Sequence, residues 1–198
     1  MTRIISGVAG GVRLDVPTSG TRPTSDRVRE ALFAALESAG AIDGARVLDL
    51  YAGSGALGLE SLSRGAASAE FVERGRPAAS VVRRNITQLT TALRTAGLAV
   101  PPTRVHESTA ITYLKRGAGT FDLVFSDPPY DIGDEAINAD LLALAPLLAQ
   151  DALVVVERTR RATPPDFAAA GLVEVRDRSY GDTRVWWAEP ASETSPNS

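Results

Sequence analysis

The pattern of hydrophobic positions along the chain changes near residue 46. From there on, short apolar runs alternate with longer segments whose apolar residues recur every three or four positions. The first pattern is typical of buried strands and the second of amphipathic helices. Strands are expected near 47–50, 69–73, 104–106, 121–126, 152–157, 172–179 and 183–188. Helices are expected near 58–65, 77–96, 110–116, 135–148 and 164–170.

Strands that alternate with helices imply right-handed βαβ crossovers and a parallel sheet that is covered on both faces. The last two expected strands flank Gly181-Asp182, so they form a hairpin that brings one antiparallel strand into this sheet. We therefore expect an α/β fold with a seven-stranded, mostly parallel sheet.

Residues 1–23 differ from the rest because they are rich in glycine and proline. Two short alternating pieces, at 3–5 and 12–16, are expected to pair as a small β-hairpin. Thr24 or Ser25 then caps a helix that runs to about Ser38. We divide the chain into a basic arm with its helix at 1–39, a main domain at 40–190 and a disordered tail at 191–198.

Composition limits the chemistry that the chain can perform. The 198 residues include no cysteine and one histidine, so we expect no disulfide, no thiolate zinc site and no histidine-based metal centre. No apolar run has the length of a membrane span and no signal peptide is recognisable, so we expect a cytoplasmic protein. The net charge is −3, yet residues 1–29 hold five arginines against two aspartates, which favours a polyanionic partner.

One turn carries the most specific chemistry in the sequence. It contains Asp127, Pro128, Pro129 and Tyr130, and it follows the apolar run 121–125. The prolines end that strand because they lack an N–H and force extended backbone before them. A carboxylate and a backbone carbonyl can accept both hydrogens of an amino group on a flat ring, while a tyrosine stacks on the ring. We expect these four residues to be catalytic; the alternative is a purely structural turn.

A glycine-rich loop provides a second candidate site. Gly53, Gly55 and Gly58 form the pattern G-x-G-x-x-G between a strand and a helix, and Glu73 follows Gly53 by 20 residues. This spacing fits a nicotinamide dinucleotide or S-adenosylmethionine, because Glu73 can bind the ribose hydroxyls of either. Asp49 would repel a pyrophosphate and attract the ammonium and sulfonium-bearing part of S-adenosylmethionine, so we favour that cofactor.

Four sequence blocks, at 3–7, 22–33, 49–60 and 127–130, together resemble a known family. This family is the bacterial 16S ribosomal RNA guanine-N2 methyltransferases, which are class I S-adenosylmethionine-dependent enzymes. The resemblance implies a Rossmann-like class I methyltransferase fold with a small N-terminal extension. It also implies methylation of the exocyclic N2 amine of one guanine in 16S ribosomal RNA.

The resemblance also bears on the cofactor contacts. Many such methyltransferases place an acidic residue after the third strand to bind the adenine, whereas here Ser108 or Thr109 holds that place and Glu107 lies nearby. We expect His106 to be a packing residue, and we expect no metal. The expected contacts of S-adenosylmethionine are Asp49, Tyr51, Gly53, Gly55, Glu73, Arg74, Ser108, Thr109 and Asp127.

The partner implied by the resemblance is 16S ribosomal RNA within a 30S subunit or an assembly intermediate, bound by a monomer. A guanine must leave its stack to reach the site, so contacts to the RNA backbone have to support the unstacking. The arginines expected to make those contacts are Arg3, Arg13, Arg22, Arg29, Arg158, Arg160 and Arg161.

Other functions remain open at the level of sequence. The Asp127–Tyr130 motif would equally suit another planar amine, such as DNA adenine N6 or a protein glutamine. A nicotinamide-dependent oxidoreductase would use the glycine loop but would leave this motif without a role. An RNA-binding or assembly module is the third alternative.

Overall fold

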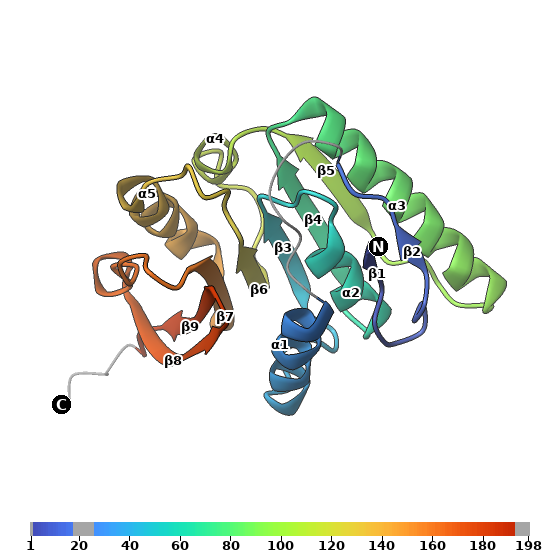
Figure 1. The fold of residues 1–198 in the computed structure, drawn as a ribbon, viewed down its shortest axis with the longest axis horizontal. Coiled ribbons are helices and arrows are strands. Elements are labelled where there is room, and N and C mark those ends of the chain that lie inside the picture. Colours follow the sequence, from blue (N-terminus) through green and yellow to red (C-terminus); the bar gives the residue numbers. More distant parts are fainter. Residues whose placement is uncertain (1, 18–25, 193–198) are drawn as a thin grey trace.

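The computed structural model describes residues 2–17 and 26–192. Its centre is a seven-stranded sheet in the order β5-β4-β3-β6-β7-β9-β8 (Figure 1). β9 runs antiparallel to both of its neighbours, whereas the other pairs are parallel. The expected α/β fold and its C-terminal hairpin are therefore confirmed. The strands are β3 Arg46–Leu50, β4 Ser68–Glu73, β5 Thr103–Glu107, β6 Phe121–Ser126, β7 Leu148–Thr159, β8 Leu172–Tyr180 and β9 Thr183–Pro190.

Helices cover both faces of this sheet, and each face has its own core. β3 illustrates the alternation, because Val47 faces one core while Leu48 and Leu50 face the other. The first core includes α1 (Asp26–Ser38), α2 (Ala56–Ser63) and α3 (Arg76–Thr95), and the second includes α4 (Ala110–Leu114) and α5 (Asp134–Leu144). Within the described ranges, no helix is both long and apolar enough to span a membrane.

Prolines explain the two places where the expected helices are wrong. The helix expected at 135–148 ends at Leu144 and passes into the short 3-10 helix Ala145–Leu147, because Pro146 cannot continue an α-helix. The helix expected at 164–170 is reduced to the 3-10 turn Ala168–Ala170, since Pro164 and Pro165 precede it without N–H donors. β7 is correspondingly longer than the strand expected at 152–157.

The N-terminal arm folds as expected into a small antiparallel hairpin of β1 (Thr2–Arg3) and β2 (Arg13–Leu14). Ile4 and Leu14 are buried in the core that also contains α1, α2 and α3. The arm is thus packed on the main domain, and the division at residue 39 remains a prediction. The expected helix cap at Thr24 or Ser25 and most of the expected tail, 193–198, lie outside the described residues.

Polar side chains of α2 hold this arm in place. The buried Glu60 carboxylate accepts hydrogen bonds from the backbone N–H groups of Ile5, at 2.7 Å, and Ser6, at 3.0 Å. The Ser63 hydroxyl accepts from the Ala9 N–H at 2.9 Å and donates to the Ser6 carbonyl at 2.6 Å. These bonds satisfy the backbone of the turn, which has no sheet partner there.

Gly7 sits where the arm comes closest to α2, so we expect Gly7→Ala to be strongly destabilising. Its φ is +80°, and an added Cβ would lie 1.9 Å from the Ser63 carbonyl oxygen. Gly11 has a similar φ of +88° but open space around it, which makes Gly11→Ala the matched control. Urea unfolding should give a loss of about 1 kcal/mol for the control and about 3 kcal/mol for Gly7→Ala. Equal losses would contradict the close contact.

Candidate active site

A pocket of about 300 Å³ opens at the carboxyl edge of the sheet, beside the ends of β3, β4 and β6. β3 and β6 are neighbours in the sheet but not in sequence, so the chain reverses its winding direction between them. Crevices at such switch points are the usual ligand sites of open α/β sheets. The residues that line the pocket are Tyr51, Gly53, Val72, Glu73, Arg74, Ser108, Thr109, Ala110, Ile111, Asp127, Pro129, Ile132, Ala136, Ala139 and Asp140.

The glycine loop between β3 and α2 forms one wall of the pocket. Its backbone turns sharply, with φ of +60° at Tyr51, +56° at Gly53 and +77° at Gly55. The Gly53 N–H donates to Glu73 Oε2 at 3.0 Å, and the Gly55 N–H donates to the Ala52 carbonyl at 2.6 Å. The amides of Gly53 and Gly55 are therefore engaged by the protein itself.

Asp49 lies behind this wall and is not among the residues that line the pocket. Its side chain is 2% exposed, and its Oδ2 accepts from the Gly58 N–H at 3.0 Å. Burial raises the pKa of Asp49 well above its ordinary value, and the nearby carboxylates of Asp127 and Glu73 raise it further. We expected Asp49 to touch the cofactor; in the structure its visible role is to hold the loop against the start of α2.

Asp140, which no sequence motif singled out, pairs with Tyr51 in the lining of the pocket. The Tyr51 hydroxyl donates to the Asp140 carboxylate of α5, which ties the glycine loop to that helix. Burial is the main cause that raises the pKa of Asp140, and it also raises the pKa of Tyr51. Ala136, Ala139 and Asp140 line the pocket with helical spacing, which was a visible signal for one face of α5.

The turn after β6 forms the opposite wall. Asp127 and Pro129 line the pocket, Pro128 is buried, and the next residue, Tyr130, is 65% exposed. Arg158 fixes the end of this turn, because its guanidinium donates to the Ile132 carbonyl at 2.8 Å. The expected catalytic residues are thus held together at the pocket, with Tyr130 at its rim.

The residues after β5 also reach the pocket, as expected for an adenine site. Ser108 and Thr109 both line it. The Thr109 hydroxyl accepts from the Thr112 N–H at 3.3 Å and so caps α4. His106 lies outside the pocket wall and bonds Glu70 at 2.7 Å.

The expected RNA-binding arginines do not share one environment. Arg3, Arg13, Arg160 and Arg161 are exposed. Arg22 lies outside the described residues.

The expectation that Arg29 binds RNA is corrected, because its side chain is 1% exposed and its guanidinium donates to the Arg3 carbonyl and to Asp26 at 2.9 Å. It supports the hairpin instead of facing a ligand. The Arg158 side chain is 9% exposed and holds the turn after β6.

Residues 2–189 of the chain match the protein family described as Conserved hypothetical protein 95. The chain belongs to this family. Its similarity to the Escherichia coli K12 protein named ribosomal RNA small subunit methyltransferase D is 44% identity over 158 residues, which cover 78% of this chain and 73% of that protein. The Haemophilus influenzae protein of the same name is 36% identical over 160 residues, which cover 78% and 77%.

Solved structures share the fold of this family member. A hypothetical protein of Thermus thermophilus superposes with a TM-score of 0.77 at 31% identity, covering 96% of this chain and 99% of the other. Magnesium protoporphyrin IX methyltransferase from Synechocystis PCC 6803 shares the fold, with a TM-score of 0.64 at 16% identity and coverage of 83% and 79%. The resemblance found in the four sequence blocks and the class I methyltransferase fold are both confirmed.

The raised pKa of Asp49 predicts a pH effect on stability. In the folded protein Asp49 keeps a proton that the unfolded chain releases above pH 3.8. The free energy of unfolding contributed by Asp49 therefore falls as the pH rises from there toward the folded pKa. The slope is up to about 1.4 kcal/mol per pH unit. Asp49→Asn removes the titration and keeps an acceptor for the Gly58 N–H, so its unfolding free energy relative to wild type should increase with pH. Urea unfolding across about pH 4–8 measures this; a constant difference would contradict it.

Proposed function

We propose that the chain transfers a methyl group from S-adenosylmethionine to the exocyclic N2 amine of a guanine in 16S ribosomal RNA. The observation that carries the proposal is the pocket that joins the glycine loop to Asp127 and Pro129. A cofactor held against the loop would present its reactive end to the turn that is suited to a planar amine. The names of the Escherichia coli and Haemophilus influenzae relatives support small-subunit ribosomal RNA as the substrate.

The charge of the pocket supports S-adenosylmethionine over a dinucleotide. Among the described residues that line it, three carry carboxyl groups, Glu73, Asp127 and Asp140, and one carries a guanidinium, Arg74. A pyrophosphate needs free backbone N–H groups at the glycine loop, but Gly53 and Gly55 already donate theirs within the protein. A sulfonium and an ammonium group suit this acidic wall, and Glu73, which lines the pocket, would accept hydrogen bonds from a ribose diol.

The turn after β6 would act on the amine. When bound, S-adenosylmethionine supplies an electrophilic methyl group on a positively charged sulfur. The lone pair of a guanine amine is delocalised into the ring, so the nitrogen has to become more tetrahedral to attack. Asp127 and the Pro128 carbonyl would accept its two hydrogens, favour that geometry and stabilise the positive charge that develops on nitrogen.

Tyr130 would orient the base. Its exposed ring can stack on the guanine and align the amine with the methyl–sulfur bond. The methylated amine is cationic and strongly acidic, so its proton passes to water without a dedicated general base. Asp127 therefore acts by accepting hydrogen bonds and by its charge.

The substrate is tested with tritiated S-adenosylmethionine and three acceptors in parallel, followed by nucleoside analysis. The acceptors are 30S subunits that lack the native modification, naked 16S RNA and genomic DNA. We expect label in N2-methylguanosine of ribosomal RNA, with 30S subunits labelled faster than naked RNA. Label only in N6-methyladenine would overturn the substrate. No label in any of them, despite measured cofactor binding, would direct the search to protein amines.

Asp127 has a specific predicted phenotype. Asp127→Ala should lower kcat by about 10²–10³ while changing the S-adenosylmethionine Kd by less than about threefold, because the side chain acts mainly on the amine. Asp127→Asn should be milder, since its amide oxygen still accepts a hydrogen bond. Glu135→Ala is the matched control, because Glu135 is an exposed carboxylate at the start of α5, just after the same turn, and does not line the pocket. Near-native turnover of purified Asp127→Ala would refute the mechanism.

The exposed arginines after β7 predict a change in salt dependence. Arg160→Ala and Arg161→Ala should each weaken binding to the RNA substrate and reduce the slope of log Kd against log salt by about 1. The KM for S-adenosylmethionine should not change. Arg94→Ala, at the exposed end of α3, is the control. Filter binding at several salt concentrations provides the slopes, and slopes equal to those of the control would exclude these two contacts.

A further inference from the structure

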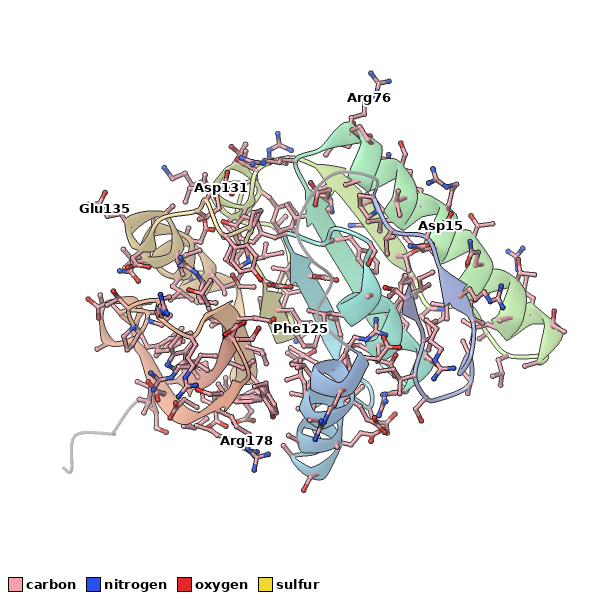
Figure 2. All side chains as sticks on the ribbon, in the orientation of Figure 1. Asp15, Arg76, Phe125, Asp131, Glu135 and Arg178 are labelled. Carbon is pink, nitrogen blue, oxygen red and sulfur yellow. The ribbon has the colours of Figure 1, made fainter. Side chains whose placement is uncertain are left out.

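Asn85 of α3 is a fully buried polar side chain that no step above uses. It is 0% exposed, and its amide makes three hydrogen bonds. Oδ1 accepts from the Asp15 N–H at 2.8 Å. Nδ2 donates to the Asp15 carbonyl at 2.9 Å and to the Ser54 carbonyl at 2.8 Å. Asp15 lies where the N-terminal arm runs along α3 (Figure 2).

The Ser54 contact acts on the glycine loop at its most constrained point. Ser54 lies between Gly53 and Gly55, whose φ angles are both positive. Its carbonyl is held by Asn85, while the preceding N–H of Gly53 is held by Glu73. Side chains from α3 and β4 therefore fix two peptide groups of the loop that lines the pocket, Ala52–Gly53 and Ser54–Gly55, on either side of the Gly53–Ser54 peptide.

The two Asp15 contacts act on the arm. Both backbone groups of Asp15 pair with the same amide, so Asn85 takes the place that a neighbouring strand would have. The amide uses both of its N–H donors in these bonds, one for the arm and one for the loop. A displacement of the arm at residue 15 would therefore disturb the bond to Ser54 as well.

We propose that Asn85 is a positioning residue that couples the N-terminal arm to the glycine loop, so that a docked arm and a bound cofactor stabilise each other. The inference rests on the proposed use of S-adenosylmethionine. Arg13 is exposed on the same arm, two residues before Asp15. RNA bound at Arg13 would therefore affect the cofactor pocket through the hydrogen bonds of the Asn85 amide. Coupling of this kind is reciprocal, so the cofactor must also steady the arm.

Calorimetry and steady-state kinetics on point variants test the coupling. Asn85→Ala removes all three bonds, and Asn85→Asp keeps only the acceptor for the Asp15 N–H. Both should raise the Kd and KM for S-adenosylmethionine about tenfold or more, with kcat at saturating cofactor within about threefold of wild type. A general loss of folded protein would not produce this split between KM and kcat.

Arg84→Ala is the matched control for these variants. Arg84 precedes Asn85 and contacts the same arm residue through an exposed ion pair, 3.2 Å from Asp15 Oδ2, without touching the glycine loop. Its Kd for S-adenosylmethionine should stay within about twofold of wild type, since exposed ion pairs contribute little. Folded Asn85→Ala with wild-type cofactor affinity would overturn the proposal.

Hydrogen exchange on the wild-type protein gives a second test that needs no variant. Addition of S-adenosylmethionine should slow exchange in the glycine loop and also in peptides that cover residues 12–17. Protection of the loop with unchanged exchange at 12–17 would overturn the coupling alone. A wild-type protein that binds no S-adenosylmethionine would overturn the proposed function, and this inference with it.

Discussion

The reversal of the chain at the end of β3 is the constraint on which the other features depend. Three residues with positive φ bring the backbone from the sheet into α2 within a few positions. Two carboxyl groups stabilise the turn by accepting hydrogen bonds from its backbone. Asp49 accepts from the Gly58 N–H and Glu73 accepts from the Gly53 N–H. Because the same turn lines the pocket, the groups that stabilise the fold also determine what can bind there.

The second wall is rigid for a different reason. Pro128 and Pro129 stop β6 through covalent geometry, and Arg158 of the neighbouring β7 fixes the end of the turn at Ile132. The pocket is thus enclosed by one loop held by hydrogen bonds and one turn held by its prolines. Tyr51 joins the two sides through Asp140 of α5, the helix that follows the second wall.

Patterns that are local in sequence could be predicted, whereas long-range pairings could not. The strand periodicity, the glycine loop and the Asp127–Tyr130 motif each lie within a few residues, and the sequence led correctly to the sheet. Eight of the expected catalytic and cofactor residues also line the pocket, where their roles remain predictions. The burial of Arg29 could not be foreseen, because it depends on the backbone of Arg3 in a separate element. The same holds for Asn85, whose partners lie 31 and 70 residues away.

The hydrogen bonds within the glycine loop also bear on the chemical selectivity of inhibitors. A compound that anchors itself by phosphate or sulfate groups would meet amides that already have acceptors and a wall of carboxyl groups. Adenosine analogues with a positively charged side arm match this pocket and are poorly suited to nucleotide sites that cradle a phosphate. The acceptors that already engage the Gly53 and Gly55 N–H groups therefore matter for ligand choice as much as the three glycines do.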